Sequence, residues 1–228
     1  MRISHSHIFS TLVITLVTIH LSVAHAAGIL FEPYGGIEKG SWSTSYETST
    51  ATYDLIAGST FDLGVGFRTV IPFKYIFFGV DYYKGMSSWG YNEASGTTLD
   101  DTRQDVKADK SSMGLHFGAK NVSGKYAFWA SYLFANDLTL KQSHVPGEGA
   151  ISYSGTGVQV AFALQFRQYM RVNMVYSIHS YSERTQNGTT VQLPGSSGGT
   201  TYQKYSHTSF FVGISAPLFW KLWTTVPF

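Results

Sequence analysis

The chain has 228 residues, of which 16% are aromatic and only 13% charged, whereas charged residues make up about 25% of an average globular protein. The formal net charge of +2 is too small to indicate a nucleic-acid-binding surface. Because the chain contains no cysteine, disulfides, thiolate metal sites, cysteine nucleophiles and a lipid-modified cysteine anchor are excluded.

The N-terminal residues have the pattern of a secretory signal peptide. Arg2 supplies a positive start, an apolar run follows from Ile8 to Val23, and Ala24-His25-Ala26 is typical of a cleavage site. An uncleaved anchor helix is the alternative, but threonines and a histidine interrupt the apolar run. We therefore predict a signal peptide over 1–26 and, since no linker divides the rest, one domain over 27–228. Any later membrane crossing must use strands closed into a barrel.

Alternating apolar and polar residues predict eight strands. The clearest is Val158–Arg167, in which five large apolar side chains share one face and Gln159, Ala161 and Gln165 lie on the other. Each segment is close to the length that a tilted strand needs to cross a bilayer. The expected strands are Ile29–Trp42, Leu55–Arg68, 76–83, 113–120, 125–134, Val158–Arg167, 171–179 and 209–218.

The connections between these strands alternate between short and long. Short ones are expected at Thr69–Lys74, Asn121–Gly124 and Gln168–Met170. Long ones, rich in Ser, Thr, Gly and Asn, are expected at Ser43–Asp54, Met86–Lys110, Asn136–Ser152 and Glu183–Ser206. Outer-membrane barrels have short periplasmic turns and longer extracellular loops. The fold class we predict is therefore all-β, an eight-stranded antiparallel up-and-down transmembrane β-barrel. Pro33 and Pro217 should lie near the periplasmic ends of the strands that close it.

Aromatic residues near the expected strand ends predict girdles at the membrane interfaces. They are Trp42, Tyr46, Tyr53, Phe73, Tyr75, Tyr82, Tyr83, Trp89, Tyr126, Phe134, Tyr169, Tyr181, Phe219, Trp220 and Trp223.

With these features the chain after Ala26 resembles the bacterial eight-stranded outer-membrane barrels, a group that includes OmpX-like, OmpW-like and OmpA-type transmembrane domains. The resemblance is architectural and includes no diagnostic motif. It implies a last strand that ends in an aromatic residue read by the barrel assembly machinery. Phe219 and the final Phe228 are the two candidates, and the extra segment 220–228 departs from the family pattern.

Alternation alone does not decide which face is inside, because a soluble lipocalin-like barrel alternates too. Here the polar face mixes glycines with a few large residues, which suits a narrow lumen, and the other face would aggregate in water. The residues expected in the lumen are Glu38, Asp62, Arg68, Asp81, His116, Lys120, Lys125, Gln159, Arg167, Arg171 and His179. Buried charges need partners, so we interpret this set as a structural network, with a polar path for a solute as the alternative.

No catalytic, cofactor-binding or metal-ligating residue is predicted. The histidines at 116, 144, 179 and 207 do not have the spacing of a local metal pair. His207 and Ser209 form an H-x-S pair that resembles the lipid A 3-O-deacylase family, another eight-stranded barrel. In that family the acid follows the serine, whereas no Asp or Glu follows Ser209 here, so Glu183 would have to substitute.

The leading hypothesis is a non-enzymatic outer-membrane scaffold that acts through its extracellular loops. Mixed charges over 93–110 fit a solvated loop or a contact with lipopolysaccharide phosphates. A narrow OmpW-like channel for small or apolar solutes is the alternative, with a hydrophobic trough near Tyr34, Phe77, Trp129 and Phe211. A lipid A-modifying acyl hydrolase is a further one. Expected partners are outer-membrane lipid, lipopolysaccharide and the barrel assembly machinery, with a small solute in the channel alternative and no nucleic acid; a monomer is expected.

Overall fold

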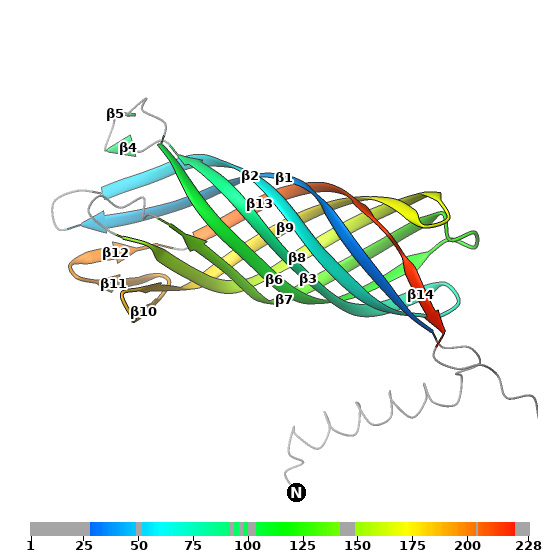
Figure 1. Cartoon of the computed structure of the whole chain (residues 1–228). Coiled ribbons are helices and arrows are strands. Elements are labelled where there is room, and N and C mark those ends of the chain that lie inside the picture. Colours follow the sequence, from blue (N-terminus) through cyan, green and yellow to red (C-terminus); the bar gives the residue numbers. More distant parts are fainter. Residues whose placement is uncertain are drawn as a thin grey trace, which may run out of the picture.

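The barrel is closed by eight long antiparallel strands (Figure 1). The computed structural model describes residues 28–48, 52–91, 94–95, 98–99, 104–141, 149–203 and 205–221. β1 pairs with β2 on one side and with β13 on the other, so the eight long strands close on themselves. The strands are β1 Gly28–Thr48, β2 Thr52–Pro72, β3 Ile76–Tyr91, β6 Gln104–Lys120, β7 Tyr126–Leu140, β8 Ile151–Arg167, β9 Met170–Gln186 and β13 Tyr205–Ser215, which β14 Leu218–Lys221 continues along β1. The predicted fold is confirmed; the segment 1–26, predicted to be a signal peptide, lies outside the described residues.

The two prolines meet where the barrel closes, as expected. Pro33 lies in β1, and Pro217 separates β13 from β14. The β1–β13 register ends at Tyr34 opposite Ser215, and the β1–β14 register resumes at Phe31 opposite Leu218. Between them the Ala216 amide donates to the Pro33 carbonyl at 3.0 Å. The seam therefore stays bonded around the missing proline donors.

The two ends of the barrel differ. At the short-turn end, residues 73–75, 121–125 and 168–169 connect neighbouring strands, and β1 and β14 meet there (Figure 1). The long-segment end carries the short strands β4 Ala94–Ser95, β5 Thr98–Leu99, β10 Thr189–Gln192, β11 Gly195–Ser197 and β12 Thr200–Tyr202. Gly28 and Lys221, the first and last described residues, pair with each other at the short-turn end, as predicted for the two ends of the barrel.

The strands run further toward the long-segment end than expected. Much of the predicted connection Ser43–Asp54 is strand, because β1 pairs with β2 as far as Glu47 opposite Thr52. In the same way Lys110, expected at the end of a loop, lies well inside β6. Both segments were predicted to be loops because they are rich in Ser, Thr and Gly. They form strands nevertheless, because the preference of a residue for a strand depends on its neighbours on the adjacent strands.

The outward face is a continuous apolar belt. Val65, Met86 and Leu115 are 65%, 70% and 57% exposed, and large apolar side chains on every strand of the barrel share this orientation. Apolar surface on this scale belongs in lipid rather than water. The inverted arrangement, polar inside and apolar outside, is that of a transmembrane barrel of the outer-membrane type. Among the residues that the structure describes, no helix is long and apolar enough to cross a membrane.

A band of serine and threonine follows the belt toward the long-segment end. On adjacent strands Ser41 pairs with Thr208 at 3.2 Å, and Thr139 pairs with Ser152 at 3.1 Å. Hydroxyls pairing on the outer face mark where the barrel leaves the hydrocarbon layer and enters the polar zone.

The belt predicts a position-dependent cost for an added charge on β6. Leu115→Arg is expected to destabilise the folded barrel by about 2–4 kcal/mol, the cost of a lipid-facing arginine near the bilayer midplane. Ser111→Arg, on the same face but in the hydroxyl band, should cost about 1 kcal/mol or less. Urea unfolding of the protein refolded into vesicles measures both. Equal costs would mean that Leu115 does not face lipid.

The girdle prediction is wrong for four aromatics. Trp42, Tyr83, Trp89 and Tyr181 are buried inside the barrel. Their nearness to expected strand ends suggested an interface, but each has the inward orientation of its strand. Tyr75, Tyr126, Tyr169 and Trp220 are exposed at the short-turn end and fit the girdle.

Candidate functional site

The lumen is filled by side chains arranged in levels, and the level nearest the short-turn end contains two ion pairs. Arg68 lies 3.6 Å from Asp81, and Arg171 lies 3.4 Å from Glu32. Tyr34 donates a 2.6 Å hydrogen bond to Asp81. The Arg68 guanidinium also lies 4.7 Å from the Tyr34 ring centre and 4.4 Å from that of Trp129. Each buried charge in this level thus has a partner of opposite charge.

A third ion pair, between Lys110 and Glu38, lies at mid-height. Lys110 donates to Glu38, and their side chains are 1% and 5% exposed. The ammonium lies 5.5 Å from the Tyr83 ring centre. Asp62, fully buried, lies close enough to Lys110 and Glu38 to interact with both electrostatically. Lys110 is therefore the cation that balances two buried carboxylates.

Two histidines from adjacent strands stack on each other next to this pair, on its long-segment side. The ring centres of His179 and His207 are 5.2 Å apart, with planes 20° from parallel. Asn136 and His179 share a 3.0 Å hydrogen bond, and Thr60 and His207 share one of 3.1 Å. These bonds fix the orientation of both rings.

Within the described part of the chain, Glu38, His179 and His207 are the residues that together could hold a metal, with ligand atoms all within 4.8 Å. β9 and β13 bring the two histidines opposite each other in register, which their distance in sequence conceals. Lys110 already neutralises Glu38, and a divalent cation would have to approach that ammonium closely. We therefore interpret the cluster as a hydrogen-bonded support for the ion pair.

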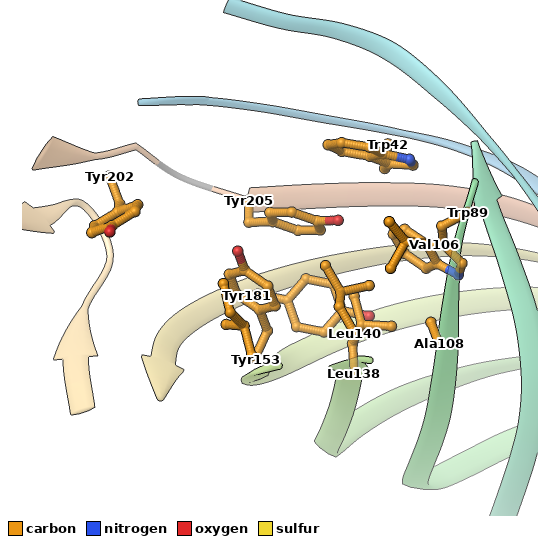
Figure 2. Close-up of a cluster of buried hydrophobic side chains, with 11 residues drawn as sticks. Trp42, Trp89, Val106, Ala108, Leu138, Leu140, Tyr153, Tyr181, Tyr202 and Tyr205 are labelled. Carbon is orange, nitrogen blue, oxygen red and sulfur yellow. The ribbon is translucent and has the colours of Figure 1, made fainter. Parts of the chain in front are cut away.

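An aromatic plug closes the lumen toward the long-segment end (Figure 2). Tyr205 is at its centre: its ring stacks on Trp42 at 5.4 Å and on Tyr153 at 4.5 Å, and meets Tyr181 edge-on at 5.5 Å. The members come from many strands; they are Trp42, Trp89, Val106, Ala108, Leu138, Leu140, Ile151, Tyr153, Tyr181, Tyr202 and Tyr205. This plug was not predicted, because most of its positions were assigned to loops or girdles.

Most of the residues predicted for the lumen lie there. Glu38, Asp62, Arg68, Asp81, His116 and His179 are buried, and Lys120, Gln159 and Arg171 are half-buried. Lys125 and Arg167 are exposed, so these two predictions are wrong. Lys125 belongs to the turn before β7, and a bulge between Gln165 and Arg167 ends the alternation of β8.

Several luminal polar residues were absent from that prediction, among them Glu32, Lys110, Asn136 and Arg184. Glu32 was placed on the polar face but not among the luminal charges, and Lys110 was assigned to a loop. Asn136 and Arg184 follow bulges in β7 and β9, each of which shifts the inward parity by one residue. Extending the alternation of β6 toward lower residue numbers would have predicted that Lys110 points inward. Asn136 and Arg184 could not be predicted in this way, because the alternation does not indicate where a bulge occurs.

The H-x-S pair lies inside the barrel. His207 and Ser209 are both buried, on the inward face of β13. His207 shares its Nε2 hydrogen bond with Thr60. An acyl chain in the membrane cannot reach these atoms through the barrel wall. The geometry therefore does not support a lipid-facing serine nucleophile.

The expected hydrophobic trough is packed around Tyr34 and Phe211, whereas Phe77 and Trp129 line a cavity toward the short-turn end. Tyr34 and Tyr83 both meet Phe211 edge-on, at 5.8 and 6.0 Å, and Phe77 lies 6.4 Å from Trp129. The space left around Tyr34 and Lys110 is about 20 Å³, room for little more than one water. A larger cavity of about 100 Å³ remains at the short-turn end.

No family model matches the chain, and no curated protein matches it. Among solved structures it is similar to Neisserial surface protein A, with 11% identity over 82% of this chain and 97% of that one and a TM-score of 0.42. AlkL, an outer membrane protein solved in lipid bilayers, gives 9% identity, coverages of 90% and 96%, and a TM-score of 0.47. OmpT, the outer membrane protease of Escherichia coli, is 8% identical over 84% of this chain and 97% of that one, with a TM-score of 0.40. Similarities this distant assign neither a family nor an activity.

Proposed function

We propose that the protein is an integral outer-membrane barrel that acts as a non-enzymatic envelope scaffold and presents its long-segment end to the cell exterior. The supporting observation is the filled lumen. Ion pairs and aromatic rings occupy it at successive heights, so the described interior holds no continuous path for a solute. Function then lies in the segments that the rigid barrel supports.

The proposal predicts that the wild-type barrel is electrically silent. The mature chain, refolded into planar bilayers and shown to be folded by heat-modifiable gel migration, should give no discrete conductance steps. Steps that persist after repurification would contradict the plugged scaffold. They would favour the narrow channel for small or apolar solutes instead.

The outer segments can be tested without disturbing the barrel. β9 and β10 form a hairpin whose turn, Asn187-Gly188, has positive φ at both residues, the geometry that Asn-Gly favours. Replacing the exposed hairpin residues Thr189, Thr190 and Gln192 with alanine keeps the turn and the plug residue Tyr202. This variant should fold normally but reduce adhesion of expressing cells to cultured epithelial cells. A variant altered only in the turn at 121–125 is the control. Unchanged adhesion in the first variant would exclude this segment as the functional surface.

Lipopolysaccharide is the partner that this proposal favours on the outward face. Lys39 and Lys107 are exposed there and lie in one row of cross-strand pairs through Phe61 and Ser88. Ammonium groups near the edge of the belt suit lipid phosphates.

Removing both charges, Lys39→Gln with Lys107→Gln, should therefore reduce the stabilisation that added lipopolysaccharide gives to the refolded barrel against urea. The matched control is Lys74→Gln with Lys125→Gln, two exposed lysines at the short-turn end. If the control pair has the same effect, the loss reflects net charge and not a specific contact.

A further inference from the structure

The cavity at the short-turn end combines an apolar wall with cationic groups. Its apolar lining includes Leu30, Val70, Phe77 and Phe219, and its volume is about 100 Å³. Its polar lining consists of Glu32, Arg68, His116, Lys120 and Arg171. A pocket with this composition suits a small amphipathic molecule better than a bare ion.

The cavity has a surplus of positive charge. Arg68 is paired with Asp81, and Arg171 with Glu32, so both arginines are neutralised. Lys120 is half-buried in the wall and has no carboxylate within ion-pair distance among the described residues. One uncompensated ammonium in a partly desolvated recess favours an anion of single charge.

The walls also hold buried hydrogen-bonding groups without partners. His116 is 2% exposed and Trp129 is 4% exposed, and both line the cavity. In the described part of the chain neither His116 nitrogen has a hydrogen-bond partner, and neither does the Trp129 indole nitrogen. The acceptor nearby, Glu32, already receives bonds from Ser215 and Arg171. The indole and one imidazole nitrogen are donors that lack an acceptor, which is what a carboxylate supplies.

Two glycines allow this arrangement. Gly79 lies opposite His116, and Gly118 lies opposite Phe77, in the β3–β6 register. A β-carbon on Gly79 would come within 2.9 Å of the imidazole, and one on Gly118 within 2.5 Å of the Phe77 ring. The rings of His116 and Phe77 therefore occupy space that a β-carbon at either glycine would take.

We propose that this cavity is a binding site for a small organic monocarboxylate. Lys120 pairs with the carboxylate, His116 and Trp129 donate to it, and the apolar wall covers a short hydrocarbon tail. The site is at the end opposite to the segments invoked for surface function, so it does not depend on the scaffold proposal.

Butanoate titrated into the refolded full chain, followed by isothermal calorimetry, tests the site. Butanoate should bind the wild type, whereas its neutral analogue butanol should not. Lys120→Gln and His116→Phe, which keeps a flat ring but removes both nitrogens, should each weaken binding about tenfold, as expected for loss of one charge-assisted hydrogen bond. Lys125→Gln, at an exposed position in the neighbouring turn, is the matched control and should bind as the wild type does.

The possible contrary results are distinct. Equal binding of butanol would show a merely apolar recess, and equal or tighter binding of inorganic phosphate would show a general anion site. Equal loss in Lys125→Gln would show an effect of net charge. Failure of folded wild type to bind butanoate at all would overturn the proposal, while gel migration establishes that each variant is folded.

Discussion

Replacing Lys110 with methionine is expected to destabilise the barrel by about 3–5 kcal/mol, because removal of one partner from a buried ion pair leaves the other charge uncompensated. Here the loss exposes two carboxylates to each other, since Lys110 lies beside both Glu38 and Asp62. Urea unfolding in vesicles, followed by tryptophan fluorescence and gel migration, measures the change.

The exposed pair of Lys141 and Asp109 provides a matched control on the outer face. Its side chains are 55% and 44% exposed, so Lys141→Met should cost only about 0–1 kcal/mol. Combining Lys110→Met with Glu38→Gln should recover part of the loss, because the main uncompensated charge is then gone. If Lys110→Met costs no more than Lys141→Met, the mid-height level is solvated and the closed-lumen interpretation fails.

Much of the barrel could be predicted because its strands alternate with a period of two. The faces of Val158–Arg167 were assigned correctly almost to its end, and the seam prolines lie as expected. A barrel in lipid enforces this alternation at every pair of neighbouring strands, because a slip by one residue would expose charges to hydrocarbon.

Strand length could not be predicted in the same way. Once a strand leaves the hydrocarbon layer, serine and threonine are stable on its outer face, as Ser41 and Thr208 show. Such a segment has the composition of a loop but retains its cross-strand bonds. Lys110, Trp89 and Tyr181 were misplaced for this reason, although each follows the inward parity of its own strand.

Contacts between residues far apart in the sequence could not be predicted either. The stacking of His179 on His207 depends on the β9–β13 register, and the bond from Asn136 depends on a bulge in β7. Neither register nor bulge leaves a residue pattern that a single chain reveals. The cavity at the short-turn end could not be predicted for the same reason, because it depends on a register that places Gly79 and Gly118 opposite two rings.

Tyr205 provides a test of whether the aromatic plug is a gate or a structural core. It is fully buried and contacts Trp42, Tyr153 and Tyr181 (Figure 2). Tyr205→Ala should therefore cost about 3–5 kcal/mol, the usual loss for truncating a large buried aromatic. Tyr169→Ala, at an exposed position in a short turn, should cost about 1 kcal/mol or less.

Despite that loss, the Tyr205→Ala barrel should remain silent in planar bilayers. The plug lies in series with the Lys110–Glu38 level and the Arg68–Asp81 level beneath it, and only about 20 Å³ of space remains between these two ion pairs. A cavity opened at one height cannot carry ions past the next, because each remaining level keeps its charges paired and its rings packed. Conductance steps that appear in Tyr205→Ala but not in Tyr169→Ala would show instead that the plug is the barrier to ions. They would favour a gated channel over the scaffold.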